Sequence, residues 1–70
     1  MKEFSLEGRP FVTLNNLLKL EGMSDSGGAA KHSIAEGLVL VDGQVETRKR
    51  CKIVAGQVVE FHGVSVRVTE

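Results

Sequence analysis

The spacing of apolar residues changes within residues 26–46, which read SGGAAKHSIAEGLVLVDGQVE. The first half has the period of a helix, with Ser26 or Asp25 available as an N-cap and Gly37 as a C-terminal stop. We therefore expect a helix over residues 28–36. The buried side expected for it consists of Ala30, Ile34 and Leu38.

The second half of this stretch is extended. Residues 38–41 form a short apolar run, and the Asp42-Gly43 pair after it is a strong signal for a two-residue hairpin turn. Residues 44–47 then return along the first strand. A helix followed directly by a hairpin is therefore the central prediction.

The flanking residues supply another helix and further strands. Residues 4–6 alternate as a short edge strand, and residues 13–21 have helical spacing, with Thr13 as N-cap and Gly22 as stop. The remaining expected strands are residues 57–61 and 64–69, and residues 53–54 come before an expected turn at residues 55–56. The sequence predicts an α+β fold in one domain over residues 1–70, with two short helices packed on a small antiparallel sheet that has a short N-terminal edge strand.

Length and composition limit what the chain can do. It has 70 residues, nine basic and nine acidic, giving a formal net charge of zero and a pI near 6.7. So short a chain buries roughly 60% of its unfolded surface, which argues against an enzyme with a deep pocket. The single cysteine excludes an internal disulfide, and no apolar run approaches the ~18 residues of a membrane span. We expect a non-enzymatic cytoplasmic protein without membrane contact.

Positive charge is concentrated after the hairpin. Within residues 48–52, four residues are basic and none is acidic: Arg48, Lys49, Arg50 and Lys52. Such a cluster can contact several phosphates, and arginine can bind phosphate oxygens bidentately. The alternative is a solvated loop whose charges prevent edge-to-edge sheet pairing, and the four cations alone favour that alternative slightly.

The start of the helix at residues 28–36 shifts the balance toward anion binding. Gly27 and Gly28 leave backbone amides open at the helix N-terminus, and Lys31 and His32 follow one turn later. A glycine pair by itself is more often a flexible loop. Combined with the basic cluster, it gives the chain two candidate phosphate-binding segments.

These segments resemble a known RNA-binding module. Residues 26–34 and 37–46 are similar to the alpha-L RNA-binding motif, which is named after the small-subunit ribosomal protein S-four. The motif also occurs in heat-shock ribosome-rescue proteins, pseudouridine synthases and tyrosyl-tRNA synthetases. Its pattern is a Ser-led helix start, basic residues in that helix, and Gly-x-Val-x-Val-Asn-Gly at the hairpin. Residues 45–53 and 56–59 resemble the segment that follows in small stand-alone bacterial proteins of the YbcJ type.

The resemblance implies an RNA-facing surface on the helix and on the segment after the hairpin. The residues that correspond to it are Lys31, His32, Arg48, Lys49, Arg50 and Lys52. Gly27 and Gly28 are added as candidate RNA-binding residues because of their open amides. Two positions depart from the pattern. Gly27 stands where many members have Arg or Lys, which implies weaker or more selective phosphate contact, and Asp42 replaces the hairpin Asn, which implies a negative charge near the site.

Other chemistry has little support. His32 and His62 lack partners at metal-ligand spacing, and no Ser-His-Asp or Cys-His set is present. The glycine pair lacks the Gly-Lys-Ser/Thr ending of a nucleotide phosphate loop. Cys51 lies between cations that could lower its pKa, but we favour an ordinary inward-facing cysteine. We expect no catalytic residues, no metal, no cofactor and no small-molecule substrate.

Two functions suit such a module. The first is a non-catalytic RNA-binding protein that contacts the phosphates of structured RNA, with ribosomal RNA or the ribosome as the candidate partner. Phe4, Phe11 and Phe61 are expected in the core, which leaves no aromatic platform for stacking single-stranded bases. The alternative is a protein-interaction module that docks through the hairpin or a sheet edge. The residues alone leave the two near even, and the resemblance favours RNA.

Overall fold

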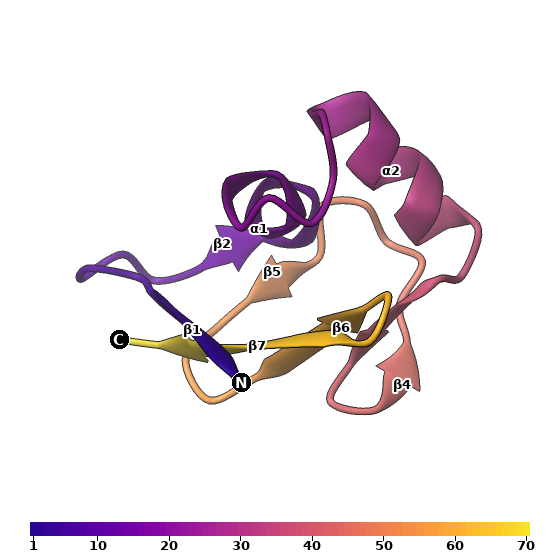
Figure 1. Cartoon of the computed structure of the whole chain (residues 1–70). Coiled ribbons are helices and arrows are strands. Elements are labelled where there is room, and N and C mark those ends of the chain that lie inside the picture. The colour runs from indigo at the N-terminus through magenta and orange to yellow at the C-terminus, as the bar shows by residue number, and fades with distance from the viewer.

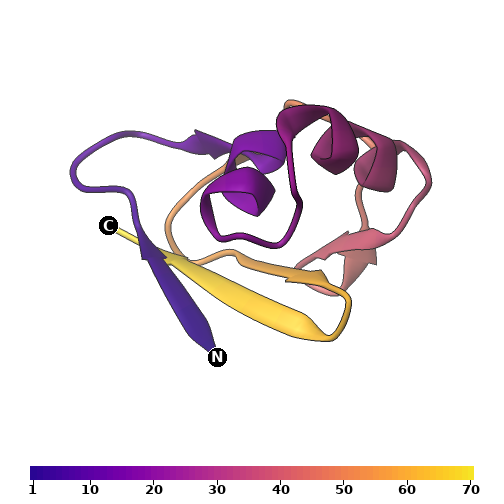
Figure 2. The same ribbon diagram turned by 45° about the horizontal axis from the view of Figure 1, so that its top comes forward.

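The computed structural model describes all 70 residues and places two helices over one side of a five-stranded sheet (Figure 1). The strands are β1 (Lys2–Ser5), β2 (Val12–Thr13), β3 (Val39–Val41), β4 (Gln44–Val45), β5 (Lys52–Ile53), β6 (Val58–Phe61) and β7 (Val64–Thr69), and the helices are α1 (Leu14–Leu20) and α2 (Gly27–Ala35). The turned view shows the same layering, with both helices together above the sheet (Figure 2). The predicted α+β architecture is confirmed. Neither helix has the length and apolar character needed to cross a membrane.

The five-stranded sheet is mixed, with the strand order β1-β7-β6-β3-β4. All its pairs are antiparallel except the first, because β1 lies parallel to β7, with Phe4 opposite Val68. The expected antiparallel sheet is corrected on this point, while β1 is the predicted edge strand. Two short strands, β2 and β5, pair separately as an antiparallel ribbon in which Thr13 lies opposite Lys52.

Both helices end in the same way, at a glycine with a positive φ. Gly22 has φ 70° and Gly37 has φ 78°. In each case the amide of the residue that follows this glycine donates a hydrogen bond to a carbonyl in the last turn of the helix. Met23 N donates to Leu18 O at 2.9 Å, and Leu38 N donates to Ser33 O at 3.2 Å. This is the Schellman arrangement, which favours glycine because a Cβ strains the left-handed backbone. The predicted helix ends are therefore confirmed.

The core is one cluster of thirteen buried residues between the helices and the sheet. The predicted helical positions Ala30 and Ile34 are buried, but Leu38 is 53% exposed. Placing Leu38 on the buried side is wrong because the left-handed turn at Gly37 takes it off the helix face. The expected aromatic core is confirmed for Phe61, which is buried, and Phe4 packs partly against the cluster. Phe11 is half-buried and lies outside it.

The hairpin between β3 and β4 is built as predicted, with Asp42 at φ 51° and Gly43 at φ 81°. Asp42 also fastens the hairpin to β6. Its Oδ1 accepts a hydrogen bond from the Val58 amide at 3.0 Å, and its own amide donates to the Val58 carbonyl at 2.8 Å. The Asp42 carboxylate therefore has a structural role beyond the turn itself.

The first prediction concerns Asp42. Asp42→Ala removes the acceptor for Val58 N and leaves a less tolerant residue at positive φ, so the free energy of unfolding should fall by about 1–2 kcal/mol. Asp42→Asn keeps an oxygen acceptor and tolerates the left-handed backbone, so it should stay close to the parent protein. Urea denaturation of the three proteins measures this, and equal losses in both variants would contradict the role of the side-chain bond.

Candidate nucleic-acid interface

The basic segment, Arg48–Lys52, crosses the start of α1. The carbonyl of Lys49 accepts from the Asn15 amide at 3.1 Å, and that of Cys51 accepts from the Leu14 amide at 2.9 Å. The first amides of a helix have no partner within it, so these carbonyls act as its cap. The expected capping bond from the Thr13 hydroxyl is absent, which corrects the sequence prediction. The backbone of the basic segment is thus fixed by α1.

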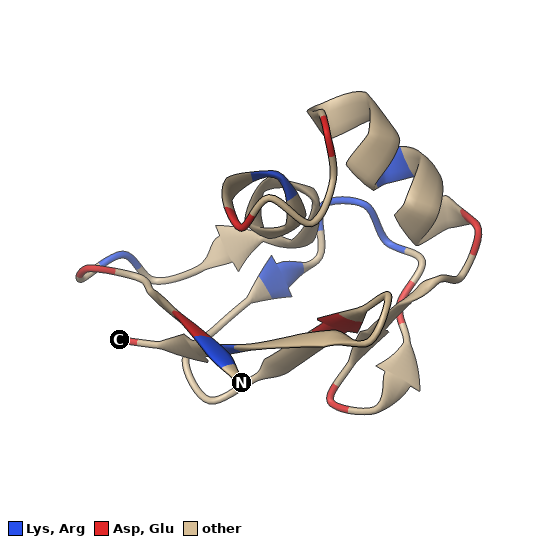
Figure 3. Cartoon of the chain, in the orientation of Figure 1, with Lys and Arg blue, Asp and Glu red and all other residues tan.

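The four basic residues of this segment are exposed. The Cys51 amide donates to the Arg48 carbonyl at 3.2 Å, which closes a tight turn with Lys49 and Arg50 exposed at its tip. Figures 1 and 2 both place this loop on the helical side of the molecule. Figure 3 shows Lys and Arg positions in blue on this loop and on α2, where the Lys or Arg residue is Lys31.

Part of the basic segment surrounds an open hollow of about 430 Å³. Its lining residues are Arg48, Arg50, Cys51 and Lys52. Three of the four are cations, so we call it the cationic hollow. The Lys52 ammonium lies 4.9 Å from the centre of the Phe11 ring, within the range of a cation–π contact that helps to place it. A hollow with this lining suits an anion.

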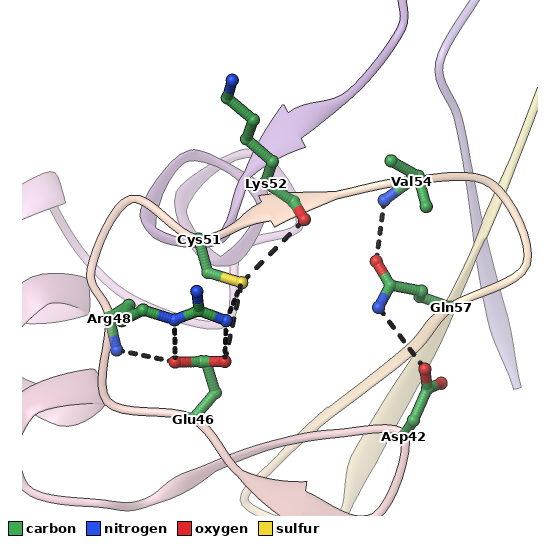
Figure 4. A network of polar contacts seen from close by, with 7 residues as sticks. All are labelled: Asp42, Glu46, Arg48, Cys51, Lys52, Val54 and Gln57. Carbon is green, nitrogen blue, oxygen red and sulfur yellow. Dashed lines mark hydrogen bonds and ion pairs between the residues drawn. The ribbon is translucent and has the colours of Figure 1, made fainter.

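Arg48 is held by Glu46, which the sequence analysis did not single out as a contact of the site. The Glu46 carboxylate accepts from the Arg48 backbone N, Nε and Nη2, each at 2.9 Å (Figure 4). These bonds, together with the Arg48 charge, lower the pKa of Glu46 to about 2. One edge of the Arg48 guanidinium is therefore occupied within the protein, and Nη1 is the nitrogen left without a partner.

Cys51 is the ordinary cysteine that we favoured. It is half-buried and packs against the core cluster. Burial raises the pKa of its thiol, and the Glu46 carboxylate, 3.6 Å from Sγ, acts in the same direction. The neighbouring Arg48 opposes this rise without cancelling it. Activation of the thiolate by adjacent cations is thus not what the structure indicates.

The candidate residues on α2 form a second group. Ser26 Oγ accepts from the Ala29 amide at 3.1 Å, so Ser26 is the cap and Asp25 is not. The amides of Gly27 and Gly28 have no acceptor in the protein. His32 Nε2 lies 3.5 Å from Glu36 Oε1, and Lys31 has no ion-pair partner. None of these α2 residues lines the cationic hollow. The structure therefore brings Arg48, Arg50 and Lys52 together at the hollow, whereas the candidate residues of α2 lie outside it.

The Asp42 carboxylate makes its hydrogen bonds to residues 57 and 58. One carboxylate oxygen of Asp42 lies 3.4 Å from Gln57 Nε2 (Figure 4). The other accepts a hydrogen bond from the Val58 amide at the start of β6. The carboxylate that contacts the basic segment directly is that of Glu46. A local signal for this existed in the sequence, because an acidic residue two positions before an arginine can fold back onto it.

A second prediction follows from the lowered pKa of Glu46. Its ionised form is favoured in the folded protein, so the stability from this pair is complete above about pH 4.5 and is lost as the pH falls toward about 2. The difference in unfolding free energy between the parent protein and Glu46→Gln should shrink over this interval. Denaturation from pH 6 to pH 2 measures it. A difference that stays constant down to pH 2 would contradict the ion pair.

Two named relatives are similar to this chain over most of its length. The E. coli (strain K12) protein named "Putative RNA-binding protein YbcJ" is 66% identical over 68 residues, covering 97% of each chain. The B. subtilis (strain 168) protein named "Probable ribosome maturation protein RlbA" is 40% identical over 52 residues, covering 74% of this chain and 73% of that one.

A solved structure matches the whole fold. The solution structure of E. coli YbcJ, described as revealing an alpha-L motif involved in RNA binding, superposes with a TM-score of 0.77 at 64% identity. It covers 100% of this chain and 89% of the other. The family model of the S4 domain matches residues 4–69. The chain therefore belongs to the S4 domain family and has the alpha-L fold that its sequence predicted.

Proposed function

We propose that this protein binds structured RNA, without catalysis, through phosphate contacts from the basic segment and from α2. The observation that carries the proposal is the cationic hollow, which is lined by Arg48, Arg50 and Lys52. The backbone of this segment is fixed by its hydrogen bonds to the start of α1. Arg50 and Lys52 have no carboxylate partner, so their charges are available to an anion. The names of the relatives, which describe RNA binding, support the same reading.

Structured RNA suits this surface better than single strands. Single-strand binders stack bases on exposed aromatic rings. Here Phe61 is buried, Phe4 packs against the core and Phe11 lies under Lys52, while Trp and Tyr are missing from the sequence. Recognition then depends on the phosphates and on the shape of a folded RNA.

We place the RNA partner at the ribosome and the protein in the cytoplasm. One relative is named as a ribosome maturation protein, which supports ribosomal RNA over other structured RNAs. The α2 residues Gly27, Gly28, Lys31 and His32 join the basic segment in this proposal. With about four phosphate contacts, a fourfold rise in salt should weaken binding by roughly two decades.

One observation favours a second candidate, a protein-interaction module. Val45 on the short edge strand β4 is 58% exposed, and Leu38 just before β3 is 53% exposed. Exposed apolar side chains beside a free strand edge can dock on another protein. Such docking would depend little on salt, which separates it from phosphate binding.

A third prediction tests the cationic hollow. Arg50→Gln combined with Lys52→Gln removes two unpaired cations, so the affinity for a ribosomal RNA hairpin should fall about tenfold or more. The slope of log affinity against log salt should decrease by about two. Fluorescence anisotropy at several salt concentrations measures both quantities.

The matched control for that double variant is Lys2→Gln with Arg67→Gln. It removes the same charge from β1 and β7, away from the hollow, and should retain most of the affinity. Equal losses in the two double variants would show that only net charge matters. Salt-independent RNA binding, or none, with retained binding to a protein partner would favour the interaction module.

A fourth prediction concerns the glycine that departs from the family pattern. A Cβ at Gly27 would meet no atom within 4 Å, and its backbone does not have positive φ. Gly27→Arg should therefore leave the fold intact, favour the helix, and tighten RNA binding severalfold with a salt slope steeper by about one. Gly27→Gln is the uncharged control in the same binding assay. Unchanged affinity in Gly27→Arg would remove the start of α2 from the interface.

A further inference from the structure

Glu46 is the acidic residue that contacts the basic segment. Its side chain is 17% exposed, against 76% for the Arg48 side chain beside it. A carboxylate next to the cationic hollow repels phosphates, so on charge alone Glu46 weakens the proposed binding. The geometry of its contacts indicates a second effect in the opposite direction.

The Glu46 carboxylate is held in place from the sheet side. The backbone amide of Glu46 donates to the Val39 carbonyl on β3 at 3.0 Å, so the backbone of Glu46 is fixed where the chain leaves β4. From this position the Glu46 carboxylate accepts hydrogen bonds from Nε and Nη2 of Arg48, at 2.9 Å each. Two bonds on one edge set the plane of the guanidinium. Figure 4 shows Nη1 of Arg48 directed away from Glu46, without a partner.

The Cys51 thiol completes this arrangement. Its Sγ lies 3.6 Å from both Glu46 Oε1 and Arg48 Nη2. Cys51 and Arg48 both line the cationic hollow. The guanidinium is therefore held at the wall of the hollow by a partly buried carboxylate, with its remaining edge open.

We propose that Glu46 is a positioning residue, which holds the Arg48 guanidinium at the cationic hollow with its Nη1 edge free for an RNA phosphate. The inference rests on the proposed RNA binding and names a residue that tunes it. A free arginine loses side-chain entropy when it binds a phosphate, whereas a held one has already lost it in folding. This preorganisation outweighs the repulsion, because the Glu46 charge is already paired with Arg48.

Glu46→Gln separates positioning from simple charge, since glutamine has nearly the same size without the charge. If Glu46 only repels phosphate, the variant binds the ribosomal RNA hairpin more tightly, with a salt slope steeper by about one. If it positions Arg48, the variant binds about three- to tenfold more weakly, although a negative charge has been removed. Glu60→Gln on β6 makes the same charge change at a residue without an ion pair, and should not weaken binding.

A double-mutant cycle identifies the residue through which Glu46 acts. In an Arg48→Gln background, Glu46→Gln should no longer weaken binding, because no guanidinium is left to hold. A merely structural role for Glu46 would persist in that background. In the free parent protein, the NMR signal of Arg48 Nε–H should be protected from exchange, and Glu46→Gln should abolish that protection.

The outcomes are distinct. Equal or tighter binding by folded Glu46→Gln, while the parent protein binds, overturns the positioning role alone. Absence of RNA binding by the parent protein overturns the proposed function and this inference with it. If Glu46→Gln does not fold, Glu46→Asp keeps the charge on a side chain one methylene shorter, and weaker binding is the expected result for it too.

Discussion

The cap on α1 is the contact on which the rest of the site depends. The carbonyls of Lys49 and Cys51 satisfy two amides at the start of the helix, and an unsatisfied buried amide costs about 1–3 kcal/mol. The pairing of β2 with β5 lies next to this cap, and Ile53 of β5 is buried in the core. The backbone of the basic segment is thus required by the fold. Its charged side chains, which the fold does not need inside, are directed to solvent.

A chain with no net charge can still offer phosphates a cationic surface, because its charges are sorted along the sequence and in space. Residues 31–52 contain five basic and three acidic residues, and both remaining parts of the chain are slightly acidic. Within residues 31–52, the Glu36 carboxylate lies beside His32 and the Glu46 carboxylate is paired with Arg48. Weak long-range steering and short-range phosphate contact are the expected consequences. In the proposed function, the cationic hollow and α2 contact the RNA at close range.

Features encoded by neighbouring residues could be predicted from the sequence, and features made by distant residues could not. The helix ends and the Asp42-Gly43 turn depend on local backbone preferences and were predicted, and Ser26 was one of the two predicted caps of α2. The parallel pairing of β1 with β7 and the cap on α1 join residues more than thirty positions apart, for which periodicity gives no signal. The bond between Asp42 and the Val58 amide was missed because it joins distant residues. The contact between Glu46 and Arg48 is local, and its sequence signal was overlooked. The RNA contacts of the candidate residues remain predictions.

The most direct test of the account is an amide NMR titration of the labelled protein with a structured ribosomal RNA fragment, at low and at moderate salt. The account predicts shifts confined to residues 27–32 and 48–52 that weaken as salt increases. Shifts confined to the edge strand β4 and the outer face of the sheet, or no shifts at either salt, would contradict it.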